Sequence, residues 1–144
     1  MPLPSLLALA DEHAYEAHFE REYVRGPRVA TYDGVQVRFL ATQFRHVFHK
    51  DSSRGANDKA VFDLDRARRM DWIRCVLADQ SLEVYRRVME NGEIRRIVLH
   101  PRPRYVVITQ VYSENPPKEV FITAFWVRDP NSRTLANIRS NPRW

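Results

Sequence analysis

The sequence predicts a single α+β domain in which N-terminal helices and a β-hairpin are followed by a four-stranded antiparallel sheet. Apolar residues recur at helical spacing through much of the first half, whereas the second half contains four β-rich segments separated by turn residues. Helices segregated from an antiparallel sheet define this class. We expect residues 1–25 to form an acidic helical appendage and residues 26–144 to form the domain itself.

The first predicted elements are a helix and a hairpin. Residues 3–24 carry a loose apolar stripe with acidic residues between its members, and Arg25-Gly26-Pro27 ends the pattern. The two short β-rich runs within Val29–Leu40 flank Asp33-Gly34. This dipeptide favours the type I′ turn of a β-hairpin, because both of its residues tolerate positive φ.

A second helix is expected over Thr42–Lys50, directly after the hairpin. Its side chains divide into two groups at about 100° per residue. One face carries the apolar side chains Phe44, Val47 and Phe48. The opposite face carries His46, His49 and Lys50. This arrangement suits acid/base chemistry beside a phosphate, and it equally suits an ordinary solvated helix face.

The clearest helical pattern spans Asp63–Leu77, after a polar loop at Asp51–Lys59. Asp63 can cap the helix, and apolar residues continue the stripe that Arg66 begins. An arginine on a core-facing stripe must pair with a carboxylate, extend to solvent or point into a cleft. Arg66 therefore has a structural interpretation and a ligand-binding one.

The second half predicts an antiparallel meander and a short final helix. The expected strands are Leu82–Met89, Glu93–His100, Tyr105–Tyr112 and Val120–Val127. The helix covers Arg133–Arg139, and the Arg-Trp tail after it is expected to fray.

Composition indicates an anionic partner. The net charge is +5, and arginine outnumbers lysine twenty to three. Arginine suits bidentate phosphate contacts and base stacking, so nucleic acid is the favoured partner, although a generic arginine-rich surface gives the same composition. The single cysteine, Cys75, excludes a disulfide framework within the chain. With no apolar run of membrane-spanning length and no basic leader before Leu3–Ala10, we expect a cytoplasmic protein without membrane contact.

Three segments resemble a known family of nucleases. They are Phe44–Lys50, the run from Phe62 through Asp65–Ile73 with its Arg-Ala and Trp-Ile pairs, and Val120–Phe125 with its Thr-Ala-Phe end. In this order they are similar to phage-associated nuclease domains of the barnase–EndoU–colicin E5/D–RelE superfamily. The resemblance covers roughly residues 35–128 and leaves the N-terminal helix outside.

The resemblance implies metal-independent ribonuclease chemistry on RNA. The ribose 2′-hydroxyl attacks the adjacent phosphate, which requires a base, an acid and cations for the developing charge. No metal or other cofactor is expected. Members of the superfamily are often toxins, so a cognate inhibitor or immunity protein is an expected partner.

Five residues are candidates for catalysis. His46 and His49 are the candidate acid and base, since histidine titrates near neutral pH. Zinc binding by this pair lacks a third ligand in the sequence pattern. Lys50 and Arg66 are the candidate phosphate cations. Thr123, predicted to share a strand face with Phe121 and Phe125, is a candidate phosphate ligand or simply a β-branched strand residue.

Four further residues are candidates for substrate binding: Arg69, Tyr85, Arg95 and Arg96. Each could hold a phosphate or stack on a base, and each could equally be an ordinary surface residue. The leading hypothesis is thus a metal-independent endoribonuclease. The alternatives are a non-catalytic nucleic-acid-binding module on the same fold and an interaction protein that docks through its acidic N-terminal helix.

Overall fold

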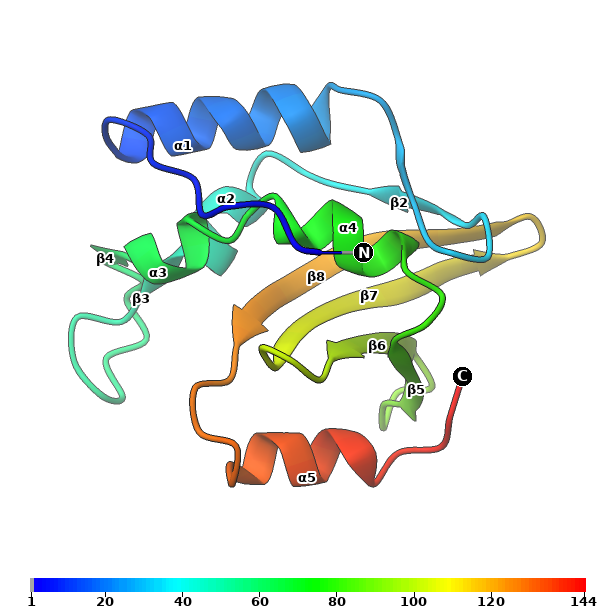
Figure 1. Ribbon diagram of the computed structural model, residues 1–144. Coiled ribbons are helices and arrows are strands. Elements are labelled where there is room, and N and C mark those ends of the chain that lie inside the picture. Colours follow the sequence, from blue (N-terminus) through cyan, green and yellow to red (C-terminus); the bar gives the residue numbers. More distant parts are fainter. Residues whose placement is uncertain (1) are drawn as a thin grey trace.

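The computed structural model describes residues 2–144, which form a mixed α+β structure (Figure 1). The helices are α1 (Glu12–Phe19), α2 (Gln43–Phe48), α3 (Leu64–Ala67), α4 (Trp72–Ala78) and α5 (Arg133–Arg139), and a π-helical turn (Glu20–Val24) extends α1. The short strands are β1 (Val29–Ala30), β2 (Gln36–Arg38), β3 (His49–Lys50) and β4 (Val61–Phe62). The long strands are β5 (Glu83–Val88), β6 (Ile94–His100), β7 (Tyr105–Glu114) and β8 (Pro117–Trp126).

The main sheet has six strands and is mixed, so it is not the four-stranded antiparallel sheet that was predicted, although the four predicted strands are present as the antiparallel run β5 to β8. Its order is β1-β2-β8-β7-β6-β5. Strand β2 pairs in parallel with β8, from Gln36 opposite Lys118 to Arg38 opposite Val120, and the other pairs in this sheet are antiparallel. No local pattern can reveal this pairing, because the two strands are about eighty residues apart in the chain.

The turn of the first hairpin also differs from the prediction. Gly34 has a φ of 85°, but Asp33 is not among the residues with positive φ, so the turn is not type I′. The amide of Gly34 donates to the carbonyl of Thr31, and the amide of Thr31 donates to the carbonyl of Val35. The hairpin pairing itself is present, with Val29 opposite Val37.

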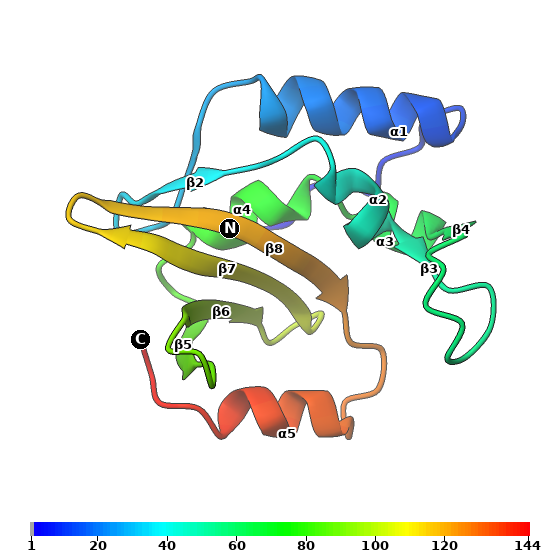
Figure 2. The same cartoon turned by 180° about the vertical axis from the view of Figure 1, so that it is seen from behind.

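Helices cover both faces of the sheet. Helices α1 and α4 lie on one side and α5 lies on the other, as the two opposite views show (Figures 1 and 2). The larger core lies between the sheet and α1, α2 and α4, and a smaller one lies between the sheet and α5. Alternate residues of the long strands therefore enter different cores.

Residues 2–11 form no helix, so the helix predicted for residues 3–24 is too long. Helix α1 begins after Asp11, whose side chain accepts a hydrogen bond from the amide of Ala14. Before it, the Pro4 carbonyl accepts a 2.7 Å hydrogen bond from the indole of Trp72. The segment expected to be an appendage supplies Tyr15, Phe19 and Tyr23 to the larger core.

Two other predicted helices are shorter than expected. Helix α2 ends at Phe48, because the backbone of His49 is extended and residues 49–50 pair with Phe62 and Val61. The helix predicted over Asp63–Leu77 is divided into α3 and α4 by a turn at residues 68–71. Phe44, Val47 and Phe48 are buried, as predicted.

The tail that was expected to fray is paired to the sheet edge. The amide of Trp144 donates to the carbonyl of Val84, and the amide of Arg86 donates to the carbonyl of Pro142. Residues 142–144 thus run along β5 and cover part of its free edge. Within residues 2–144, no helix has both the length and the apolar character needed to cross a membrane.

We predict that Phe19→Ala lowers the free energy of unfolding by about 3–5 kcal/mol. Phe19 is 0% exposed and its ring contacts Tyr23, Phe39, Phe44 and Phe48. Urea denaturation measures the change, and His13→Ala on the exposed face of the same helix should stay within about 0.5 kcal/mol of wild type. A Phe19→Ala protein as stable as wild type would show that α1 is not part of the core.

Candidate functional site

A cavity of about 320 Å³ opens beside α3, β3 and the end of β8. Its lining consists of four cations, two carboxylates and one indole. These are Lys50, Arg66, Arg69, Arg128, Asp63, Asp65 and Trp126. We call this hollow the basic cavity, because its lining carries two positive charges in excess.

The basic cavity exists because β2 is short. Strand β2 pairs with β8 only as far as Val120, so the remainder of that edge of β8 has no strand partner in the described chain. The side-chain amide of Gln43 in α2 donates to the carbonyl of Phe121 there. Further along, the guanidinium of Arg66 in α3 lies 5.8 Å from the centre of the Phe125 ring. Side chains of α3 therefore meet the end of β8.

Arg66 and Arg69 are held in defined positions. Arg66 donates to the carbonyl of Val47 (3.2 Å), its Nε lies 3.7 Å from a carboxylate oxygen of Asp63, and 34% of its side chain is exposed. Arg69 donates to the carbonyl of Asp65 (2.6 Å) and lies 4.2 Å from the ring of Trp126. The Nε–H of Arg69 is buried and has no hydrogen-bond partner within residues 2–144.

The charges around the basic cavity are only partly compensated. Arg128 pairs with Asp65, and Arg66 with Asp63. Within residues 2–144, no carboxylate lies within ion-pairing distance of Lys50 or Arg69. Beneath this region, burial raises the pKa of Tyr105 far above its usual value, so that phenol stays protonated.

The two histidines do not share the face that the helical pattern predicted. His46 is exposed on α2, whereas His49 has passed into β3 and is 7% exposed. The ring of His49 packs edge-on against the rings of both Phe44 and Phe62, and its Nε2 is 3.3 Å from a carboxylate oxygen of Glu12. Its Nδ1 has no hydrogen-bond partner within residues 2–144. Neither histidine lines the basic cavity, but the next strand residue, Lys50, does.

Thr123 is separated from Phe121 by a β-bulge. Thr109 is opposite Phe121 and Ile108 is opposite Thr123, so Ile122 is an extra residue in the ladder. Phe121 accordingly enters the larger core while Phe125 packs against the core beneath α5. The predicted common face is therefore wrong, and half-buried Thr123 is not among the residues that line the basic cavity.

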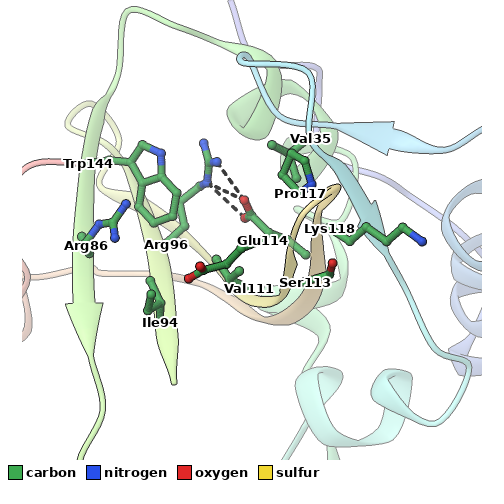
Figure 3. Close-up of a pocket in the computed structure, with 11 residues that line it drawn as sticks. Val35, Arg86, Ile94, Arg96, Val111, Ser113, Glu114, Pro117, Lys118 and Trp144 are labelled. Carbon is green, nitrogen blue, oxygen red and sulfur yellow. Dashed lines mark hydrogen bonds and ion pairs between the residues drawn. The ribbon is translucent and has the colours of Figure 1, made fainter. Parts of the chain in front are cut away.

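Arg96 is a structural residue and not a surface one. It is 1% exposed, and its guanidinium pairs with the carboxylates of Asp33 (2.9 Å) and Glu119 (2.8 Å). Burial alone would lower its pKa, but these carboxylates raise the pKa of Arg96 above its usual value. The indole of Trp144 covers the guanidinium at 4.1 Å, and Glu119 also accepts from Thr109. Arg96, Glu119 and Trp144 are among the residues that line a second hollow, of about 290 Å³, in which Figure 3 labels Arg96 and Trp144.

Tyr85 and Arg95 also differ from simple substrate-binding residues. Tyr85 is buried beneath α5, and its hydroxyl donates to Glu83. Arg95 is half-buried and contacts Gln110 across the strand pair at 3.4 Å. Of the nine site residues predicted from the sequence, the basic cavity brings together three: Lys50, Arg66 and Arg69.

Sequence reasoning missed the other side chains that line the basic cavity. Asp63 was recognised only as a helix cap, a role it has through the amide of Arg66. Arg128 follows the last strand, and its pairing with Asp65 leaves no local signal. In residues 2–144, no group of three or more His, Cys, Asp or Glu side chains is arranged to hold a metal ion.

Comparisons with protein-family models, curated proteins and solved structures give no match to this chain. The resemblance to the nuclease superfamily therefore stays a prediction. The case for a function depends on the geometry of the basic cavity.

We predict that Arg96→Met lowers the free energy of unfolding by about 3–5 kcal/mol, because Asp33 and Glu119 would lose their common cation. Arg95→Met, its neighbour on the opposite face, should stay within about 0.5 kcal/mol of wild type. Chemical denaturation of both variants measures the difference. Equal stability of the two variants would contradict a structural role for Arg96.

Proposed function

We propose that the protein binds RNA and holds a backbone phosphate in the basic cavity. The observation that carries this proposal is the convergence of Lys50 and Arg69, which have no carboxylate partner in the described chain, beside the paired Arg66 and Arg128. Cations gathered in one hollow repel one another, and a bound anion removes that repulsion. A phosphate also offers oxygens to several donors at once.

Two further features support a nucleic-acid ligand. The buried Nε–H of Arg69 lacks an acceptor in the part of the chain that the structure describes, and such a donor is costly to leave unpaired. Trp126 adds an aromatic ring to the wall, with the guanidinium groups of Arg69 and Arg128 at 4.2 and 5.3 Å from its centre, so a ribose or base would pack against the part of the indole that they leave open. The arginine excess of the whole chain favours the same class of ligand.

We predict that Lys50→Ala weakens RNA binding to a similar degree for all sequences and reduces the slope of log K against log salt by about 0.7, the value for one contact to a single strand. Lys50 is exposed, so folding should be unchanged. Arg133→Ala, at the exposed start of α5, removes one positive charge elsewhere and serves as the control. Fluorescence anisotropy titrations at several salt concentrations measure the RNA affinity of both variants. Equal losses of affinity in the two variants would show that the net charge matters and the position of Lys50 does not.

The proposal extends to metal-independent cleavage of the bound RNA, because Asp63 and Asp65 lie in the same cavity as the cations. One of these carboxylates would accept the 2′-hydroxyl proton as the 2′-oxygen bonds to phosphorus. The bond from phosphorus to the 5′-oxygen then breaks, the leaving oxygen takes a proton from water, and the carboxylic acid formed in the first step returns its proton to the solvent. The products are a cyclic phosphate and a free 5′-hydroxyl, and the cations stabilise the charge that develops on the phosphate.

We predict that RNA cleavage persists in EDTA and that an all-deoxy strand is not cleaved. Asp63→Asn or Asp65→Asn, tested separately, should lower the rate by about 10²-fold or more in one of the two cases. His46→Ala, outside the cavity, should retain activity. Product analysis on gels distinguishes the outcomes: dependence on added metal would overturn the mechanism, and salt-sensitive binding without cleavage would leave a non-catalytic RNA-binding module.

A cytoplasmic site of action belongs to the same proposal. So does a cognate inhibitor, since an RNA-cleaving enzyme threatens the cell that makes it. A protein partner that covers the basic cavity would complement it with carboxylates.

A further inference from the structure

A second group of cations surrounds a hollow on the opposite side of α2 from the basic cavity. This hollow has a volume of about 380 Å³, and residues 23–26, Arg28 and residues 37–41 line it. Three of these are arginines and none is acidic. We call it the arginine hollow, after Arg25, Arg28 and Arg38.

Each of these arginines lies within two residues of a residue that is buried in the core. Arg38 lies between Val37 and Phe39, Arg28 precedes Val29, and Arg25 closely follows Tyr23; all four neighbours are buried. A Cβ atom on Gly26 would lie 2.6 Å from the carbonyl of Arg21, so this glycine lets the chain fold back closely against the π-helical turn. The backbones that carry the three cations are therefore held in place.

Little of this charge is compensated. Arg25 pairs with Glu20 at 2.9 Å, but within residues 2–144 no carboxylate lies within ion-pairing distance of Arg28 or Arg38. Two uncompensated guanidinium groups in one hollow favour an anion. Their planar forks suit the oxygens of a phosphate.

The arginine hollow and the basic cavity lie along the same strand. Arg38 is opposite Val120 of β8, and Trp126, in the wall of the basic cavity, is six residues further along β8. At about 3.3 Å per residue, this stretch of β8 spans at most about 20 Å, and the bulge within it shortens it. Helix α2 lies between β2 and α3 (Figures 1 and 2). One small anion cannot occupy both hollows, but one polynucleotide strand can.

We propose that the arginine hollow is a second phosphate site, which binds the same RNA strand whose first phosphate occupies the basic cavity. This inference rests on the proposed function. It implies that the substrate is an extended single strand of several nucleotides, bound at two separated phosphates and not at one. The affinity should then depend on strand length, because only a long strand reaches both sites.

The test compares Arg28→Ala/Arg38→Ala with a matched control, Arg87→Ala/Arg133→Ala, which removes two exposed arginines from the β5 and α5 side. The probes are 2′-O-methyl strands, which cannot undergo 2′-hydroxyl attack: a dinucleotide and an oligomer of about 12 nucleotides. We expect the Arg28/Arg38 variant to bind the oligomer several-fold more weakly, with a salt slope reduced by about 1.4, and to bind the dinucleotide as wild type does. Circular dichroism and thermal melting establish that both variants are folded.

The outcomes separate this inference from the proposed function. The second site is overturned if the Arg28/Arg38 variant binds both probes equally weakly, or if the control variant binds the oligomer just as weakly. It is also overturned if the Arg28/Arg38 variant binds the oligomer as wild type does. Lys50→Ala reports on the first site, since it should weaken both probes. If Lys50→Ala weakens neither, the proposed function fails, whatever the arginine hollow binds.

Discussion

The buried guanidinium of Arg96 joins parts of the chain that have no local reason to meet. It lies on β6 and pairs with Glu119 on β8 and with Asp33 in the turn of the first hairpin. Burial alone would raise the pKa of Asp33, but hydrogen bonds from Arg96 and Thr31 hold this pKa below its usual value. These bonds hold the hairpin turn next to the start of β8, where β2 adds in parallel. Since five hydrogen bonds from the guanidinium to the two carboxylates, and one from the hydroxyl of Thr109 to Glu119, satisfy the network, its desolvation is compensated within the fold.

The position of β2 then decides where ligands can bind. Because β2 stops opposite Val120, helices α2 and α3 meet the rest of that edge, and the basic cavity forms between α3 and the end of β8. The arginine hollow lies beside β2 itself.

The two kinds of arginine in this protein differ in their partners. Arg96 is buried and pairs with two carboxylates, whereas Arg69, Arg28 and Arg38 have no carboxylate partner in the described chain. Arg96 is therefore a structural cation, and the other three are available to a phosphate.

The histidines show how one change of backbone direction redistributes chemistry. Helix α2 ends one residue before His49, so the imidazole turns towards Glu12 and the aromatic core while Lys50 turns towards the basic cavity. The acid/base pair suggested by the helical pattern is thereby divided. The carboxylates Asp63 and Asp65 stand beside the cations instead, which moves the proposed proton transfer from imidazole to carboxylate.

The sequence by itself determined the α+β class, the buried face of α2, the hairpin pairing of β1 with β2, and the cationic character of Lys50, Arg66 and Arg69. These depend on periodicity and composition, which act between neighbours in the chain. It did not determine the parallel addition of β2, the bulge that separates Thr123 from Phe121, the burial of Arg96 or the meeting of Arg128 with Asp65. Only the tertiary structure decided these, because each depends on contacts between residues far apart in the sequence, and because a single extra residue in a strand reverses the direction of every side chain beyond it.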